Sequence, residues 1–272
     1  MHRIIEDILE ATRKRVTALE ANVPGIVIAS DTSQNTIPQK RDITSALELA
    51  KQEGKVPIIA EVKPASPSAT FREITPDDAA IIAKEMERGG AIAISVLTEP
   101  DYFNGSVENL RSARNSVSIP VLRKDFIIDE RQMDETKSDL ILLIAGALED
   151  KLGSFVLLAQ SKGFEPLVEV HNEDELNNAL KTTAQVIGIN NRDLGTLEVN
   201  LQTTERLAPL IRDFDKKNGT RHTIISESGV HNTDDIKRVI SAGADAILIG
   251  TAIIKSSDVY IKTKEMVEAY YE

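Results

Sequence analysis

The sequence predicts one (β/α)8 barrel, an α/β fold of the TIM-barrel class, preceded by an N-terminal helical extension. From Pro57 onward, short apolar runs alternate with helix-forming segments. Eight such units occupy about 215 residues, which is the count and length of this barrel. The apolar runs are nearly continuous, as in parallel strands that are covered on both faces. No Gly-x-Gly-x-x-Gly follows the first run, which disfavours the alternative of a doubly wound open sheet.

The first fifty-odd residues predict helices that pack on the barrel. Apolar residues recur at helical spacing over 3–20, which indicates an amphipathic helix. Residues 22–41 lose this pattern and are expected to form a loop, and a short helix follows at about 45–53, closed by Gly54. This part has too little apolar surface for a core of its own. We therefore expect an extension over 1–55 and a catalytic barrel over 56–272.

The remaining elements follow in alternation. Strands are expected at 58–63, 91–97, 121–124, 140–145, 166–170, 186–190, 223–226 and 246–249. Helices are expected at 76–88, 106–115, 149–161, 203–213, 233–241 and 258–271. Two further helices are expected to begin after Asp129 and after Asn172. Thr75 before Pro76 has the side chain and the position of a helix N-cap. Gly89-Gly90 and Gly243 are expected to end helices in the left-handed conformation.

Composition limits the classes of function. The chain has 272 residues, a formal net charge of −11 and a pI of about 5.0, which disfavours nucleic acid as a partner. It contains no cysteine, so disulfides, thiolate metal sites and a cysteine nucleophile are excluded. The four histidines show no metal-ligand spacing. No apolar run could span a membrane or serve as a signal peptide, so we expect a cytoplasmic protein.

Charged and polar residues are concentrated where the predicted strands end, which is where barrels of this class carry their active sites. Glu61 and Lys63 lie two residues apart and therefore share a face of the first strand, and Asn190 and Arg192 are related in the same way. Lys124 should lie on the same side of its strand as Leu122. Such residues also form structural salt bridges around a barrel mouth, but so many together favour a pocket for acid–base chemistry.

Glu169 stands among valines at the end of the fifth strand. A carboxylate in such surroundings is either paired with a lysine or raised in pKa, and both states suit acid–base work.

The last two strands are followed by small and hydroxyl-bearing residues. Ser228-Gly229 and Gly250-Thr251 each place a small residue beside a hydroxyl at the start of a helical turn, where backbone N–H groups bind anions. The sequence therefore predicts a phosphate site after these strands.

These residues identify a family. The chain closely resembles indole-3-glycerol-phosphate synthase from residue 58 onward. The matching stretches are IIAEVKPASPS (58–68), AISVLTEPDYFNGS (93–106), PVLRKDFIIDE (120–130), ILLIA (141–145), EPLVEVHNEDEL (165–176), IGINNRDL (187–194), ISESGV (225–230) and ILIGTAI (247–253). The resemblance implies ring closure, decarboxylation and dehydration of 1-(2-carboxyphenylamino)-1-deoxyribulose 5-phosphate to indole-3-glycerol phosphate. It implies no cofactor and no metal, and we expect a monomer.

The resemblance also implies roles for single residues. Lys124 would be the general acid of ring closure, and Glu169 the acid–base carboxylate of dehydration. Lys63 would hold the substrate and share proton transfer, while Glu61 and Asn190 would orient hydroxyls and the lysines. The implied substrate-binding and phosphate-binding residues are Ser66, Phe126, Leu142, Arg192, Ser228, Gly229, Gly250 and Thr251, with Ser228 also counted among the catalytic group.

One segment departs from the family pattern. Residues 126–140 are shorter by about three residues and lack the usual Gly-Ala-Asp joint, so the local helix is expected to change while the flanking motifs stay intact. Two alternatives to the synthase are a catalytically silent phosphate-binding barrel and another barrel enzyme of the tryptophan or histidine pathway. The first would have lost a rim lysine or glutamate. The second would lack the combination of Glu61, Lys63, Lys124 and Glu169.

Overall fold

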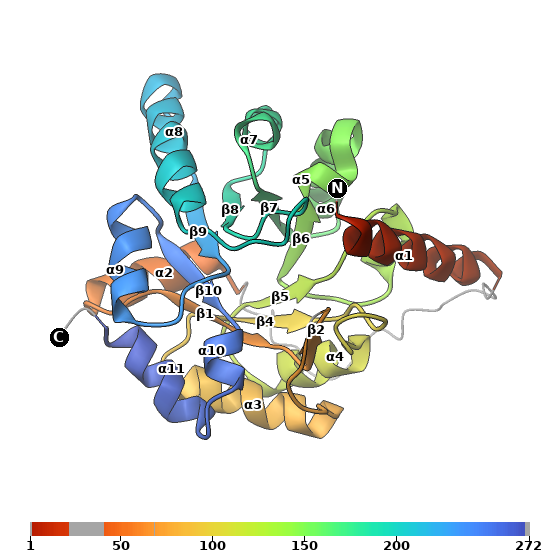
Figure 1. Cartoon of the computed structure of the whole chain (residues 1–272), viewed down its shortest axis with the longest axis horizontal. Helices are drawn as coiled ribbons and strands as arrows, with labels where there is room; N and C mark the ends of the chain where they lie inside the picture. The colour runs from red at the N-terminus through yellow and green to blue at the C-terminus, as the bar shows by residue number, and fades with distance from the viewer. Residues whose placement is uncertain (1, 22–40, 68, 270–272) are drawn as a thin grey trace, which may run out of the picture.

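A computed structural model describes residues 2–21, 41–67 and 69–269 (Figure 1). Eight parallel strands close into a barrel in the order β1-β10-β9-β8-β7-β6-β5-β4, which confirms the predicted fold. They are β1 (Ile58–Val62), β4 (Ala93–Leu97), β5 (Val121–Lys124), β6 (Leu140–Ile144), β7 (Glu165–Val170), β8 (Val186–Asn190), β9 (Thr223–Glu227) and β10 (Ala246–Ile249). A small hairpin of β2 (Ala65–Ser66) and β3 (Ala69–Thr70) follows β1.

Helices surround the barrel, and the two helices of the extension precede it (Figure 1). The helices are α1 (Arg3–Ala21), α2 (Ile43–Gln52), α3 (Pro76–Arg88), α4 (Val107–Ser116), α5 (Ala145–Leu148), α6 (Leu152–Ser161), α7 (Glu173–Ala179), α8 (Gln202–Asn218), α9 (Thr233–Ser241), α10 (Thr251–Ile254) and α11 (Val259–Val267). Thr75 caps α3 in a capping box with Asp78. Gly90 and Gly243 have φ of 95° and 113°, as predicted for helix ends. The loop predicted over 22–41 lies, apart from Arg41, outside the described residues.

Several helix boundaries differ from the predictions. The helix expected after Asp129 is the 3-10 helix η1 (Glu130–Asp134), which fits the shortened segment that precedes β6. The helix expected over 149–161 begins with α5 and the 3-10 turn η2 (Glu149–Lys151) directly after β6, and Glu149 has a φ of 49°. The helix predicted at 203–213 continues to Asn218, where Gly219 ends it in the left-handed conformation.

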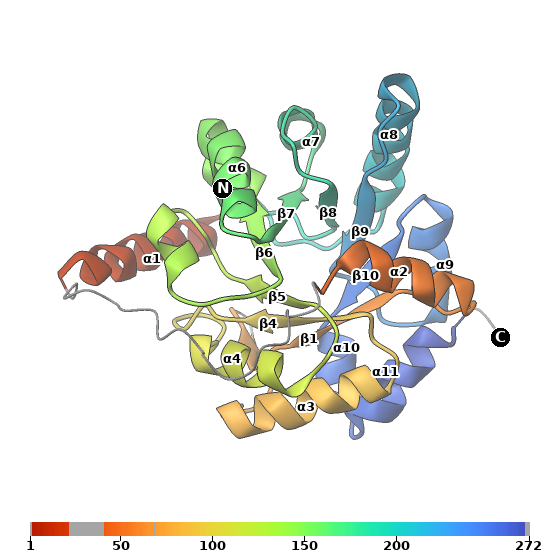
Figure 2. The ribbon, with the colours of Figure 1, turned by 180° about the vertical axis from the view of Figure 1, so that it is seen from behind.

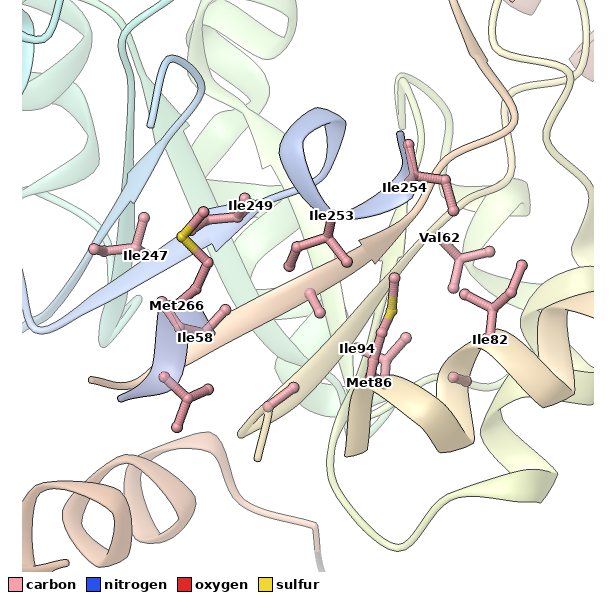
Figure 3. Close-up of a cluster of buried hydrophobic side chains, with 14 of the residues drawn as sticks. Ile58, Val62, Ile82, Met86, Ile94, Ile247, Ile249, Ile253, Ile254 and Met266 are labelled. Atoms are coloured by element: carbon pink, nitrogen blue, oxygen red, sulfur yellow. The ribbon is translucent and has the colours of Figure 1, made fainter. Parts of the chain in front are cut away.

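The outer faces of the strands form a continuous apolar layer with the helices. Ile58, Ile94 and Ile247 point outward from three neighbouring strands and are fully buried. Met86 of α3 and Met266 of α11 pack against them (Figure 3). Full burial of one such side chain is worth roughly 1.5–3 kcal/mol, so this layer fixes the helices to the barrel.

The inner faces of the strands form a separate core, which α2 closes from below. Ile43, Leu47 and Ala50 of α2 belong to the same buried cluster as Ile59 and Leu122 inside the barrel. Figure 2 shows α2 beside the ends of β1 and β10. The barrel interior is therefore filled by apolar side chains, and α2 covers its floor.

Two aspartates at the barrel floor hold α2 in place. Asp139 and Asp245 immediately precede β6 and β10, and each accepts a backbone N–H from the start of the neighbouring strand at 2.9 Å. Arg41, just before α2, lies 3.7 Å from Asp139, and Lys51 near its end lies 2.8 Å from Asp245. These two ion pairs attach both ends of the helix to the barrel.

The other helix of the extension, α1, lies at the rim. Its Ile5, Ile8 and Leu9 form a buried cluster with which Phe103 and Phe126 pack. No helix within the described residues is long and apolar enough to cross a membrane.

Candidate active site

The side chains above the barrel core follow from the two-residue period of the strands. Ile59, Leu122, Leu167 and Ile225 point into the apolar interior, each from a different strand. Two residues later these strands carry Glu61, Lys124, Glu169 and Glu227, which therefore point in the same direction, one layer nearer the rim. The apolar core thus becomes a floor for a layer of charged groups.

Lys124 is the cation at the centre of this layer. Its Nζ lies 2.6 Å from Glu227 Oε2, 3.7 Å from Glu169 Oε2 and 3.9 Å from Glu61 Oε2. The three carboxylates are at most 3% exposed. Burial would lower the pKa of Lys124, but the three carboxylates outweigh it and raise that pKa above its ordinary value. Lys124 therefore carries a proton at neutral pH, as a general acid must.

Glu227 was not among the predicted site residues. Burial raises its pKa to about 7, and its Oε1 is buried with no hydrogen-bond partner among the described residues. Glu227 therefore exchanges a proton near neutral pH, in direct contact with Lys124. Gly188 on β8 makes room for it, because a Cβ there would lie 2.2 Å from Glu227 Oε1.

The pKa of Glu169 is shifted in the opposite direction from that of Glu227. Burial would raise its pKa, but the nearby His171 and Lys124 outweigh burial and lower the pKa, and a hydrogen bond from Asn190 adds to this effect. Glu169 is therefore an ionised carboxylate and able to accept a proton. His171 was also absent from the predicted site.

Glu61 and Lys63 lie on one face, as their spacing predicts, with Lys63 Nζ 3.4 Å from Glu61 Oε1. Ser95 Oγ donates to Glu61 Oε2 at 3.3 Å. Gly250 of β10's end leaves space for this carboxylate, since a Cβ on it would lie 2.4 Å from Glu61 Oε1. Gly250 thus has a packing role beside any role in phosphate binding.

The end of the cavity near β8, β9 and β10 has the backbone expected of an anion site. Ser228 and Gly229 have φ of 66° and 85°, so the chain makes a tight turn with two consecutive left-handed residues directly after β9. Thr251 begins the short helix α10. The Arg192 guanidinium donates to the carbonyl of Leu197 at 2.8 Å, within its own loop.

The opposite end of the cavity is apolar. Phe126 and Phe103 pack with ring centroids 6.3 Å apart, and Leu142 is buried in the middle of β6. Ile4 and Ile5 of α1 also line this end, which the sequence alone did not predict. Arg15 of α1 is held there by a 3.0 Å hydrogen bond to Asp125, next to Lys124.

One cavity of about 530 Å³ unites these groups. All the residues predicted for the site line it: Glu61, Lys63, Ser66, Lys124, Phe126, Leu142, Glu169, Asn190, Arg192, Ser228, Gly229, Gly250 and Thr251. Ser66 lies at its edge in the β2–β3 hairpin. The described residues contain no group of three or more His, Asp or Glu arranged to hold a metal ion. The cavity can therefore hold an apolar ring at one end, a phosphate at the other and acid–base groups between.

Comparison with known proteins gives a consistent result. The family model of indole-3-glycerol phosphate synthase matches residues 5–266. The chain is 41% identical to the indole-3-glycerol phosphate synthase of Methanocaldococcus jannaschii over 274 residues, covering 97% of this chain and 99% of the relative. It is 43% identical to that of Haloarcula marismortui over 236 residues, with 84% of each covered.

A solved structure shows the same fold at lower sequence similarity. It is the (S)-3-O-geranylgeranylglyceryl phosphate synthase of Thermoplasma acidophilum, solved in complex with sn-glycerol-1-phosphate. Its TM-score is 0.57 at 16% identity, and the match covers 85% of this chain and 98% of the other. This likeness concerns the fold alone.

Proposed function

The chain belongs to the indole-3-glycerol phosphate synthase family, and we propose that the charged layer around Lys124 carries out the three steps of its reaction. The enzyme is a carboxy-lyase of tryptophan biosynthesis that converts 1-(2-carboxyphenylamino)-1-deoxyribulose 5-phosphate to indole-3-glycerol phosphate, carbon dioxide and water. The observation that carries the proposal is the partly buried ammonium of Lys124 within 3.9 Å of three buried carboxylates.

Ring closure is assigned to Lys124. The ring carbon that bears the carboxylate attacks the ketone carbon, and the carbonyl electrons move to the oxygen, which takes a proton from Lys124. A charged ammonium in a desolvated pocket gives this proton to a developing alkoxide more effectively than water does. Carbon dioxide then leaves, and the electrons of its bond return to the ring.

Dehydration is assigned to Glu169 with a neighbouring acid. The hydroxyl leaves as water while a base takes a proton from the adjacent carbon, which forms the new double bond. Glu169 is ionised and suits the base, and Lys63 shares the proton transfer to the leaving hydroxyl. Glu61 orients Lys63, to which it is ion-paired, and Asn190 orients Glu169.

Substrate binding uses the two ends of the cavity. We assign the phosphate to Ser228, Gly229, Gly250, Thr251 and Arg192, which line the same cavity and offer backbone N–H groups, hydroxyls and one guanidinium as donors. The anthranilate ring is assigned to the apolar end, against Phe126 and Leu142. Ser66 is placed at the entrance. Because every group in this scheme comes from one chain, we propose that the enzyme acts as a monomer.

The alternatives of a silent barrel or of another pathway enzyme are not favoured, because every predicted rim lysine and glutamate is present in the cavity. The experiment that tests the proposal is Lys124→Ala. We expect turnover, followed as indole fluorescence after substrate addition, to fall at least about 100-fold, because general acid catalysis contributes that much or more. Phosphate binding and the circular dichroism spectrum should be retained.

Lys262→Ala is a matched control, since Lys262 forms an ion pair with Glu265 on α11, outside the cavity. It should retain parent turnover. Product formation by Lys124→Ala at the parent rate would remove Lys124 from the chemistry.

A further inference from the structure

His171 connects the active site to a second carboxylate outside it. It follows directly after β7, and its side chain is 3% exposed. Its Nε2 lies 3.2 Å from Glu169 Oε1, without the alignment of a hydrogen bond, so the contact is an ion pair. Its Nδ1 lies 2.9 Å from Glu175 Oε2. The imidazole is thus held between two carboxylates, one at each ring nitrogen.

Glu175 is itself fixed in place. Its Oε2 also accepts the backbone N–H of His171 at 2.9 Å, and its Oε1 accepts from the Asn172 side chain at 2.9 Å. Asn172 caps α7 and accepts the N–H of Glu175 in return. Gly146 of α5 packs against the carboxylate, since a Cβ there would lie 2.8 Å from Oε1. Glu175 therefore presents a rigid acceptor to His171.

This arrangement determines the protonation state of the imidazole. A neutral ring has one N–H and one lone pair, so it would turn a lone pair toward one of the two carboxylates. A doubly protonated ring faces each carboxylate with an N–H. Burial would lower the pKa of His171, but Glu169 and Glu175 outweigh it and raise the pKa to about 10. The two carboxylates therefore favour the doubly protonated, cationic ring of His171 at neutral pH.

A second cation beside Glu169 matters because the proposed reaction removes the charge of the first. Lys124 is the other cation beside Glu169, and it loses its charge when it gives its proton to the substrate. Without His171, the charged groups near Glu169 would then be the carboxylates of Glu227 and Glu61, and like charges favour proton uptake. A cation that takes no part in proton transfer would keep Glu169 ionised through that stage.

We propose that His171, held by Glu175, is a positioning residue that keeps Glu169 ionised and fixes its Oε1, leaving Oε2 to act on the substrate. This inference rests on the base role proposed for Glu169. The groups near Glu169 are His171 directly after β7, Lys124 from β5, Glu227 from β9, Glu61 from β1 and the Asn190 amide from β8. Those that act on His171 are Glu169 and Glu175, and its charge also reaches Asp193.

The test compares pH profiles of His171→Gln with those of the parent enzyme. Without the imidazolium, the pKa of Glu169 should rise, so the acid limb of kcat should move to higher pH by at least about one unit, a tenfold loss on that limb. KM should change little, because His171 does not line the cavity. Glu175→Gln should also move the acid limb of kcat to higher pH, but by less than His171→Gln does.

His222→Gln is the matched control. His222 is also buried and paired with a carboxylate, Asp215, but it lies at the start of β9, at the barrel floor. It should alter stability and leave the pH profile of kcat unchanged. In the parent protein, NMR titration should show the His171 ring doubly protonated up to about pH 9, and that signal should be absent from His171→Gln.

Two results would overturn the inference. One is a His171→Gln enzyme whose acid limb coincides with that of the parent. The other is a His171 ring that titrates near its ordinary pKa in the parent protein, a measurement that does not depend on whether the variant folds. Glu169→Gln separates the two proposals. Full turnover by that variant would refute the base role of Glu169 itself, and this outcome does not depend on the NMR titration of the His171 ring.

Discussion

Gly188 offers a direct way to move one charged group of the active site without replacing it. The residue lies on β8, and no positive φ is recorded for it, so alanine is compatible with its backbone. A Cβ at this position would lie 2.2 Å from Glu227 Oε1, 3.3 Å from its Cδ and 3.5 Å from Leu167. Gly188→Ala should therefore push the Glu227 carboxylate away while leaving its chemistry intact.

The size of the effect follows from these distances. The carboxylate must retreat by about 1 Å to reach ordinary van der Waals contact. Its Oε2 is 2.6 Å from Lys124 Nζ, so the same movement disturbs the partner that contributes most to the charged state of Lys124. A misplacement of about 1 Å in an active site can cost about 100-fold in rate, and overpacking costs about 1–3 kcal/mol of stability.

The assay is steady-state indole formation together with urea unfolding. We expect kcat of Gly188→Ala to fall roughly 10–100-fold. Adding Glu227→Asp, which shortens the side chain, should restore part of the lost stability. Gly153→Ala on α6 is the control, since its Cβ would meet nothing within 4 Å and helix propensity favours alanine by about 0.5–1 kcal/mol. Parent kcat and parent stability in Gly188→Ala would refute the reasoning.

Two further variants test other parts of the structure. The raised pKa of Glu227 means that its contribution to stability is present below its ordinary pKa and is lost as pH rises through about 7. Glu227→Gln removes this loss, so its free energy of unfolding relative to the parent should increase by roughly 2 kcal/mol from pH 5 to pH 8; a pH-independent difference would contradict it. Lys51→Ala removes the partly exposed ion pair with Asp245 at the barrel floor and should cost about 0.5–1 kcal/mol in urea unfolding with unchanged kcat. A loss of kcat would show that α2 affects the rim.

The barrel and most of its active site could be predicted because they follow from local patterns. Apolar runs define the strands, and the two-residue period places Lys124 and Glu169 above the interior residues that precede them. Glu227 obeys the same rule. It was nevertheless given no role, although its neighbour Ser228 was assigned to the site, and β9 includes it.

Other features of the site were not predicted, for two different reasons. His171 lies two residues after Glu169, the same spacing that placed Lys63 beside Glu61, so the sequence did contain a signal for it. The ion pair of His171 with Glu169 requires the position of α7, since Glu175 fixes the ring. The place of α1 at the cavity follows from its packing on Phe126 and from the hydrogen bond of Arg15 to Asp125. The contacts of α1 have no signal in the spacing of the sequence, because they depend on residues that come together only in the folded chain.

The central claim is that Lys124 supplies the proton for ring closure, the step before carbon dioxide is lost. The most direct measurement is the amount of carbon dioxide and of indole product formed by Lys124→Ala from the same substrate sample. If ring closure needs Lys124, both products should be lost to the same extent, because decarboxylation requires the closed ring. Release of carbon dioxide without indole would place Lys124 after decarboxylation and would contradict the account.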